Sequence, residues 1–187
     1  MFAPRIIPTL TFANRGLQRT KRFKKPVYVG DPVNAVRIFS DKEVDELIVL
    51  DIGGGSPSYE LLSELASEAF MPMCAGGGIR SMDDVDRIFQ LGYEKVLINT
   101  ASVDNPGLIS EIAARFGTQS VVVSIDVGRS LLGRESVVVD CGKRRTNLEV
   151  VQHARNCEQA GAGEIVLRST YHDGMMDGYH VRLIGEV

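Results

Sequence analysis

Short apolar runs rich in Val and Ile alternate along the chain with longer stretches in which apolar residues recur at helical spacing. The short runs are bounded by Gly, Asp or Asn, which is typical of buried parallel strands. Six strands are predicted: Ile6–Leu10, Glu46–Ile52, Met71–Ala75, Lys95–Asn99, Ser120–Asp126 and Glu164–Arg168. Five helices are predicted among them: Asp31–Lys42, Ser58–Phe70, Ser81–Leu91, Asn105–Phe116 and Asn147–Ala160. Such alternation predicts an α/β fold with parallel strands.

One connection departs from this rhythm. Residues 128–147, which follow the strand that ends at Asp126, are too polar and too rich in β-branched residues for a helix. A small hairpin is therefore predicted before the next helix.

The chain also repeats itself. Asp45–Leu50 is echoed by Gly163–Leu167, and Ile6–Thr11 is echoed more faintly by Val122–Val127. The two copies lie roughly 120 residues apart, the length of four strand–helix units. Two equal half-barrels explain this spacing, and a doubly wound open sheet is the structural alternative.

Length and composition narrow the class of protein. The 187 residues suffice for one core but fall short of the roughly 250 residues of a complete (β/α)8 barrel. A net charge of −3 argues against general nucleic-acid binding, and no apolar run approaches membrane-spanning length. The N-terminus lacks a secretory signal and the three cysteines lack metal-ligand spacing. We therefore expect a cytoplasmic protein with reduced thiols.

Polar residues and glycines gather where the predicted strands end: Thr11, Asp51, Gly76–Gly78, Asn99–Thr100, Asp126, Ser169 and, in the next loop, Asp173–Gly174. In a barrel of this class the active site lies at these carboxyl ends. The glycine run precedes a helix, so its backbone N–H groups could cradle a phosphate. Three glycines alone are equally compatible with a tight turn, but Asn99–Thr100 on the neighbouring strand favours phosphate.

Two carboxylates and two histidines in this region allow more than one interpretation. Asp126 ends an apolar strand, a natural position for a general acid or base, and Asp51 is placed similarly. Either could instead cap a nearby loop. His172 and His180 have no evident nucleophile or metal partner and are expected to be solvated loop residues.

Charged residues mark both ends of the predicted strands. The first loop, residues 15–25, holds Arg15, Arg19, Lys21, Arg22, Lys24 and Lys25. This run is either simply solvated or attracts an anionic substrate to the active-site mouth. At the amino ends stand Arg5, Glu46, Lys95 and Glu164. These residues either meet water or form a closed ring of paired charges across the barrel floor.

Motifs along the whole chain together resemble the cyclase subunit family of imidazole glycerol phosphate synthase. They are RIIP, GDPVNAV, GGGIRS, KVLINTASVDNP, FGTQSVVVSID, GAGEI and the DG–DGY loop. The sister isomerase of histidine biosynthesis shares the half-barrel plan, but Asn99 within LINTA and the QSVVVSID strand favour the cyclase. The resemblance implies a ribulose-phosphate-binding (β/α)8 TIM barrel with about six of eight βα units. Residues 1–187 would form one incomplete domain, with no metal or cofactor.

The resemblance also implies residue roles. Gly78, Asn99 and Thr100 would hold one phosphate, and Asp173 and Gly174 would contribute to a second phosphate site. Arg19, Asp51 and Ser169 complete the expected substrate-binding set. Asp126 matches one of two catalytic aspartates. Arg5, Glu46, Lys95 and Glu164 match the gate through which ammonia enters from a glutaminase docked on the amino-terminal face, which favours the ring.

Three departures from the family pattern bear on activity. Thr11 stands where the second catalytic aspartate is expected, and a hydroxyl cannot serve as a carboxylate base near neutral pH. Arg19 replaces the family's mobile-loop lysine, and arginine stays protonated. The sequence stops within the sixth helix, so a C-terminally truncated barrel is expected. Residues 16–47 and FMPMCAGGGI resemble more closely a paralogous branch associated with surface-polysaccharide genes.

Three hypotheses follow. The chain could be a lyase-type cyclase that uses glutaminase-derived ammonia to close the imidazole ring of a phosphorylated ribulosyl-aminoimidazole carboxamide nucleotide, in histidine biosynthesis. It could instead be a non-cyclising conduit that passes ammonia to a sugar amidotransferase. An inactive fragment is the third hypothesis. No nucleic-acid or membrane partner is expected.

Overall fold

The protein is described by a computed structural model that covers residues 4–130 and 133–187. It forms two compact units. The first comprises Met1–Arg19 and Tyr28–Leu97, and the second comprises Thr20–Val27 and Ile98–Val187. The prediction that residues 1–187 make up a single incomplete barrel domain stays a prediction.

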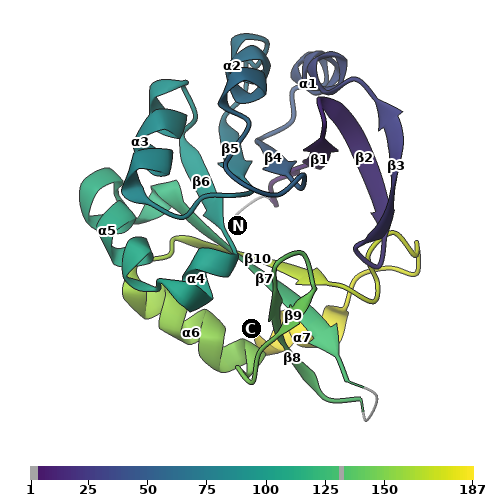
Figure 1. Ribbon diagram of the computed structural model, residues 1–187, viewed down its shortest axis with the longest axis vertical. Coiled ribbons are helices and arrows are strands. Elements are labelled where there is room, and N and C mark those ends of the chain that lie inside the picture. Colours follow the sequence, from purple (N-terminus) through teal and green to yellow (C-terminus); the bar gives the residue numbers. More distant parts are fainter. Residues whose placement is uncertain (1–3, 131–132) are drawn as a thin grey trace. The chain divides into compact units, whose positions relative to one another are not determined.

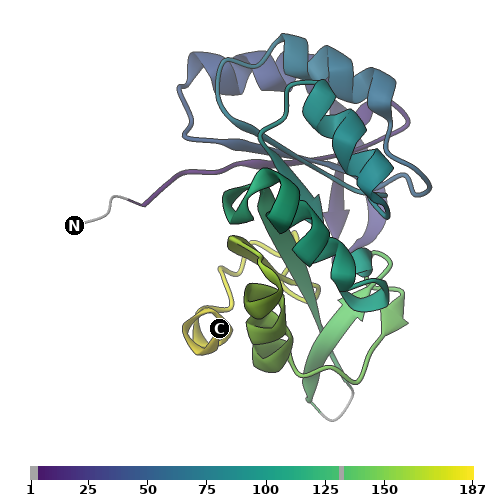
Figure 2. The same ribbon diagram turned by 90° about the vertical axis from the view of Figure 1, so that its left-hand side faces the viewer.

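Parallel strands backed by helices make up the first unit. β1 (Thr9–Ala13), β4 (Leu47–Asp51), β5 (Met73–Gly76) and β6 (Lys95–Ile98, whose last residue belongs to the second unit) pair in this order. The pairs β1–β4, β4–β5 and β5–β6 are all parallel. Helices α1 (Pro32–Asp41), α2 (Tyr59–Ser67) and α3 (Met82–Gln90) connect them. Figures 1 and 2 show the three helices along the same side of these strands.

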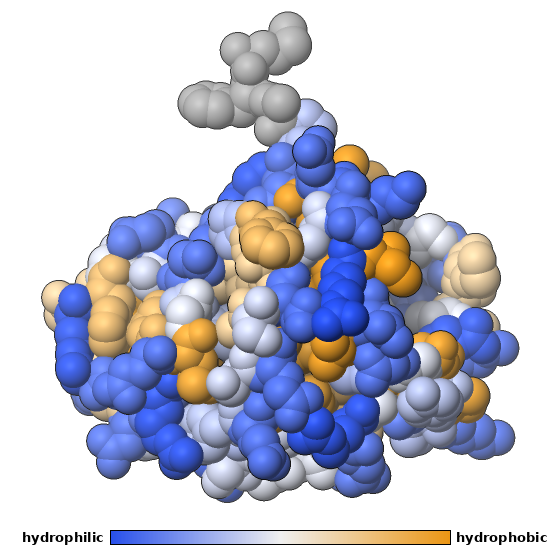
Figure 3. Space-filling model, turned by 90° about the horizontal axis from the view of Figure 1, so that it is seen from above, coloured by the Kyte–Doolittle hydropathy of each residue, from blue (hydrophilic) through white to orange (hydrophobic). Residues whose placement is uncertain are grey.

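The local sequence explains where these helices begin. Asp31 caps α1 by accepting a hydrogen bond from the Asn34 N–H (2.8 Å), and Pro32 occupies the first turn, as predicted. Ser81 and Asp84 form a capping box at the start of α3. The inward faces are apolar and fully buried at Leu65 and Val85. The view in Figure 3 shows mostly hydrophilic side chains, with hydrophobic ones in separate spots.

The first predicted strand was misplaced at its start. β1 begins at Thr9 rather than Ile6. Ile6 is 69% exposed, and its N–H donates to the Asp45 carboxylate (2.6 Å) instead of to a strand. Pro8 has no N–H to contribute to a ladder and enters only by its carbonyl, which accepts from the Ile48 N–H (3.0 Å).

The prediction of a loop at residues 15–25 was wrong, because this segment is a hairpin. β2 (Gly16–Lys21) and β3 (Lys24–Gly30) are neighbouring strands, and β2 also pairs antiparallel with β1. Positive φ values at Asn14 and Arg15, and at Arg22 and Phe23, form the two tight turns. Such turns usually carry glycine at one central position, and these two carry none. The sequence therefore lacked the usual hairpin signal.

The second unit contains the predicted hairpin excursion. β7 (Val121–Arg129) pairs in parallel with β10 (Glu164–Ser169) and antiparallel with β8 (Glu135–Val139), which pairs with β9 (Arg144–Arg145). The hairpin after Asp126 is thus confirmed, except that residues 131–132 lie outside the described part. The helical elements are α4 (Thr100–Asp104), α5 (Gly107–Phe116), a 3-10 turn (Thr118–Ser120), α6 (Val150–Ala160) and α7 (Val181–Glu186). α4 was not predicted.

The fold class is confirmed. The described residues run through successive strand–helix units, beginning with β1–α1 and ending with β10–α7, in the order of a partial (β/α)8 barrel. Each of the six predicted strands overlaps an observed one. The hairpins β2–β3 and β8–β9 interrupt this sequence after β1 and β7.

Candidate functional site

Asp126 is a buried carboxylate within β7. It is 3% exposed, and the Ser124 hydroxyl donates to its Oδ1 (3.3 Å). Burial raises the pKa of Asp126 to about 6, although the nearby Arg168 guanidinium opposes the rise. A carboxyl group that titrates near neutral pH can both take and return a proton, so the geometry suits the predicted acid–base role.

Arg168 faces Asp126 from the neighbouring strand β10 and was not among the predicted site residues. The two residues are register partners in the β7–β10 pair, with the Arg168 Nε 3.8 Å from Asp126 Oδ1. The guanidinium carbon lies 4.4 Å from the centre of the Phe23 ring, in a cation–π contact. The sequence held one signal for this pair, because Asp126 and Arg168 are the last residues of two predicted parallel strands. Asp126 therefore has a fixed cationic neighbour.

Thr11 is engaged by the adjacent hairpin. Its hydroxyl donates to the Gln18 carbonyl (2.5 Å), which links β1 to β2. A carboxylate at this position could not donate and would face the carbonyl oxygen with like partial charge. Threonine therefore has a structural role at the position where the family pattern places an aspartate.

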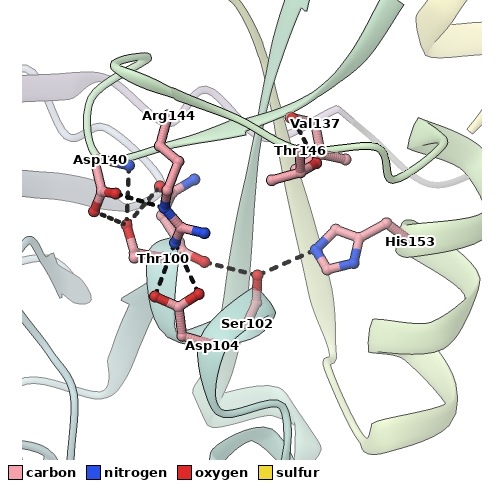
Figure 4. Close-up of polar contacts among 9 residues, drawn as sticks. Thr100, Ser102, Asp104, Val137, Asp140, Arg144, Thr146 and His153 are labelled. Atoms are coloured by element: carbon pink, nitrogen blue, oxygen red, sulfur yellow. Dashed lines mark hydrogen bonds and ion pairs between the residues drawn. The ribbon is translucent and has the colours of Figure 1, made fainter.

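The turn at Asn99–Thr100 is held by a dense set of hydrogen bonds (Figure 4). The Asn99 side-chain amide donates to the Ser124 carbonyl (2.8 Å). The Ser102 hydroxyl and N–H both donate to the Asn99 carbonyl, at 2.7 Å and 3.0 Å. The Ser102 hydroxyl also lies 3.1 Å from Nε2 of His153, a residue on α6. These bonds order the turn that is predicted to hold a phosphate.

Charge around Thr100 does not by itself favour an anion. The Asp140 N–H donates to the Thr100 hydroxyl oxygen (3.2 Å), so the β8–β9 turn lies against it. Arg144 is shared between Asp140 (2.9 Å) and Asp104 (2.8 Å), as Figure 4 shows. These three side chains carry a net negative charge. Phosphate binding at Thr100 would therefore depend on well-oriented N–H and O–H donors rather than on the Coulomb attraction of this cluster.

The glycine run is required by close packing in the first unit. Gly77 (φ 98°) approaches the Asp51 backbone, and Gly78 (φ 74°) approaches the Gly55 carbonyl, so closely that a Cβ at either position would clash. Asp51 caps its own loop by accepting from the Gly53 N–H (2.9 Å) and the Ser58 hydroxyl (2.5 Å). The tight-turn interpretation of the glycines and the capping interpretation of Asp51 both have direct structural support.

The start of α3 already carries an anion of its own. The Asp84 carboxylate accepts from the N–H groups of Arg80 (3.0 Å) and Ser81 (3.1 Å). A phosphate at Gly78 would consequently have to use donors that precede this helix. The role of Gly78 as a phosphate ligand stays a prediction.

Asp173 fastens the β2–β3 turn to the loop after β10. Its carboxylate accepts from the Thr20 hydroxyl (2.8 Å) and the Phe23 N–H (3.0 Å), and its carbonyl accepts from the Arg22 N–H (2.9 Å). Gly174 (φ 65°) packs so closely on the Thr20 carbonyl that a Cβ would overlap it. The Asp173 carboxylate is committed to this latch, and its part in a second phosphate site stays a prediction.

A pocket of about 260 Å³ lies beside this latch in the second unit. Its lining includes Phe23, Arg168, Ser169 and Asp173. Within the described part of the chain, the buried Ser169 hydroxyl oxygen has no hydrogen-bond partner that meets ordinary distance and angle limits, although its interaction with the Tyr171 hydroxyl opposes the rise in the pKa of Tyr171. Ser169 therefore lines the pocket as a candidate ligand donor, and its substrate role stays a prediction.

The two histidines of this loop are not simply solvated, so that expectation was wrong. His180 is 14% exposed and lies 3.0 Å from Glu135, which also accepts from the Tyr171 hydroxyl (2.6 Å). The Nδ1 of His180 accepts from the Leu183 N–H and caps α7. His172 is 29% exposed, and its Nδ1 lies 2.9 Å from the Asp177 carboxylate. Both rings also pack near Tyr171, which gives them a structural role in the loop.

A charge cluster around the buried Glu46 lies at the amino ends of the strands in the first unit. Glu46 is 3% exposed and accepts from the Lys95 ammonium (2.6 Å) and from the Arg5 guanidinium (3.1 Å). Three of the four predicted ring members are thus in direct contact. The fourth, Glu164, is the first residue of β10 in the second unit.

The basic residues of the first hairpin do not act as one group. Arg15 is bound by the Glu64 carboxylate on α2 (2.6 Å), and Arg19 is exposed on β2. Among the described residues, no group of three or more His, Cys, Asp and Glu side chains is placed to hold a metal ion. Within the same part of the chain, no helix is both long and apolar enough to cross a membrane.

Comparisons with known proteins find relatives along almost the whole chain. A family model described as "Histidine biosynthesis protein" matches residues 5–187. A protein of Pseudomonas aeruginosa provisionally named imidazole glycerol phosphate synthase subunit hisF2 is 47% identical over 191 residues, covering 100% of this chain and 76% of that protein. The imidazole glycerol phosphate synthase subunit HisF of Streptomyces avermitilis is 37% identical, over 99% of this chain and 75% of its own length.

Proposed function

This chain belongs to the histidine biosynthesis protein family, and from that membership we propose that it works as a cyclase-like subunit of an imidazole glycerol phosphate synthase, using ammonia from a glutaminase partner. Its substrate would be the phosphorylated ribulosyl-aminoimidazole carboxamide nucleotide, and ammonia would close the imidazole ring. The glutaminase would dock at the amino-terminal face of the strands.

The observation that carries the proposal is the charge cluster around the buried Glu46. A carboxylate that is 3% exposed is strongly destabilising unless it is paired, and here two cations pair with it. Their position at the amino ends of the strands is opposite to the ends where barrel enzymes bind substrate. A guarded entry for a small neutral molecule at that end fits an ammonia-using subunit. Glu164 is proposed as the fourth member.

Asp126 is the proposed acid–base residue. With a pKa of about 6, its carboxylate could accept a proton as ammonia adds and return it as the ring closes. Thr11, whose hydroxyl donates a hydrogen bond to the Gln18 carbonyl, would supply no second carboxylate. One phosphate would be held by Gly78, Asn99 and Thr100, and the second by Ser169 and Gly174 at the pocket. Arg19 is proposed as a further substrate-binding cation.

The test is ring closure by the purified 187-residue chain, first with ammonium and then with glutamine plus the glutaminase. Circular dichroism establishes that the protein is folded. We expect ammonium-supported turnover in the wild type and a loss of at least about 100-fold in Asp126→Asn, in line with general acid–base catalysis. Lys95→Gln should impair the glutamine-supported reaction more than the ammonium-supported one. A folded wild type without turnover under either condition would refute the cyclase proposal.

A second candidate is a non-cyclising ammonia conduit. Two observations favour it: Thr11 is committed to the hairpin, and Asp126 is held by Arg168. The glutaminase would dock as before, and ammonia would pass to a sugar amidotransferase. Glutaminase stimulation by the chain, in the absence of any ring closure, would support this candidate. A chain that neither binds nor stimulates a glutaminase would exclude both.

A further inference from the structure

His153 and Ser102 form a buried polar pair that the proposed mechanism does not use. His153 is 6% exposed on α6, and Ser102 is 3% exposed on α4. The His153 Nε2 lies 3.1 Å from the Ser102 hydroxyl oxygen and 3.7 Å from the Cys157 sulfur. A Ser–His contact of this length can mark a nucleophile and its base. Here both groups are enclosed by protein, so no substrate could reach the hydroxyl.

Hydrogen-bond accounting assigns the direction of this pair. The serine hydroxyl has one proton, and its shortest contact with an acceptor is to the Asn99 carbonyl at 2.7 Å. The histidine must then donate from Nε2 to the serine oxygen. Burial lowers the pKa of His153, which favours the neutral ring, and the hydrogen bond to Ser102 then places the single ring proton on Nε2. The chain of donors therefore runs from His153 through Ser102 to Asn99.

The Asn99 carbonyl, which accepts the last of these hydrogen bonds, determines how the Asn99–Thr100 peptide is oriented. The Asn99 carbonyl and the Thr100 N–H belong to one planar trans peptide and point in opposite directions. Two bonds from Ser102 to the carbonyl, at 2.7 Å and 3.0 Å, hold that plane. They thereby aim the Thr100 N–H away from the Ser102 side. The Asn99 amide, bonded to the Ser124 carbonyl, anchors the other end of the turn.

We propose that His153 and Ser102 are positioning residues that orient the Asn99–Thr100 peptide for phosphate binding. This inference rests on the phosphate role proposed above for Asn99 and Thr100. Because Asp104, Asp140 and Arg144 together carry a net negative charge, affinity at this turn depends on donor direction. A support for the peptide plane thus has more effect here than it would at a strongly basic site. An apolar pair of similar size would fill the same space without this effect.

The test measures phosphate binding and stability separately. Inorganic phosphate is titrated into the full chain while the Thr100 amide is followed by NMR, and thermal denaturation is measured on the same samples. We expect Ser102→Ala to weaken phosphate binding about tenfold, the lower end of the effect of losing an outer supporting hydrogen bond. His153→Gln retains a side-chain N–H donor and should bind within about twofold of the wild type.

A double variant separates positioning from core filling. Ser102→Ala with His153→Phe removes both polar partners and leaves no buried orphan, so its melting temperature should recover relative to Ser102→Ala. Its phosphate affinity should stay low, because the hydroxyl that holds the Asn99 carbonyl is absent. Thr146→Val is the matched control. It removes a part-buried hydroxyl bond to the Val137 carbonyl (2.7 Å; Figure 4) and should lower stability without changing affinity.

Each alternative result is decisive. Wild-type affinity in Ser102→Ala, or a double variant that regains both stability and affinity, would overturn the positioning role while leaving the phosphate role intact. Thr100→Val reports on the phosphate role itself and should weaken binding in either case. A wild-type Thr100 amide that does not respond to phosphate would overturn the proposed phosphate role, and the positioning role with it.

Discussion

Replacing Asp126 by Asn should change the pH dependence of stability in a way that the structure quantifies. The pKa of Asp126 is raised by burial from an ordinary value of 3.8 to about 6. A folded-state pKa above the unfolded one means that the folded protein holds the proton more tightly. The resulting stability is fully present below pH 3.8 and is lost as the pH rises through about 6.

The size of the effect follows from the two pKa values. At about 1.4 kcal/mol for each pKa unit, ionising Asp126 in the folded protein reduces the free energy of unfolding by about 3 kcal/mol. Asparagine imitates the neutral carboxyl in shape and does not titrate. Asp126→Asn should therefore match the wild type near pH 4 and exceed it by about 3 kcal/mol at pH 7.5.

Urea unfolding of both proteins at closely spaced pH values provides the assay, with circular dichroism as the signal. All other titrating groups are common to the two proteins, so the difference between their unfolding free energies isolates Asp126. A difference that stays flat between pH 4 and pH 7.5 would refute the reasoning. It would mean that Arg168 and Ser124 stabilise the carboxylate enough to cancel the cost of its burial.

Three further substitutions test the contacts around the site. Thr11→Val should lower the free energy of unfolding by about 1 kcal/mol, because the hydrogen bond to Gln18 is lost. Thr11→Asp should lower it further, because a carboxylate would face the Gln18 carbonyl, and thermal melts of the two variants test this order. Lys95→Met should lower the free energy of unfolding, measured in urea, by about 3–5 kcal/mol, because the buried Glu46 loses one of its cations. Adding Glu46→Gln should restore much of that free energy. Gly174→Ala should cost about 1–3 kcal/mol and speed tryptic cleavage in the β2–β3 turn, whereas unchanged cleavage would contradict the latch.

The apolar runs predicted most of the fold because their burial is a local property of the sequence. The run Leu47–Leu50 has no polar face, and its short length and β-branched residues favour a strand with both sides covered. The cap at Asp31 is equally local, since a short acidic side chain followed by Pro32 satisfies the first turn of a helix by itself. By contrast, the β2–β3 hairpin was not predicted, because its tight turn has Arg22 and Phe23 at the positions where glycine is usual.

The candidate site, too, could be predicted only in part from the sequence. Asp126 and the charges at Glu46 and Lys95 could be selected from the sequence, because each stands at the end of an apolar strand. The partners that decide their chemistry could not be. Arg168 is far from Asp126 in sequence and meets it only through the register of β7 and β10. The solvated role expected for His180 was wrong because Glu135, on a distant hairpin, lies within hydrogen-bond distance.

By itself, the sequence determined the strand–helix order, the helix caps, the family resemblance and the absence of an aspartate at position 11. These depend on residue type and on neighbours a few positions away. Only the tertiary structure decided that the Thr11 hydroxyl is committed to Gln18, that Asp173 latches a hairpin, and that His153 supports the Asn99 turn through Ser102. Hydrogen bonds and ion pairs form across distances of about 3 Å, so they depend on which strands and helices the fold brings together.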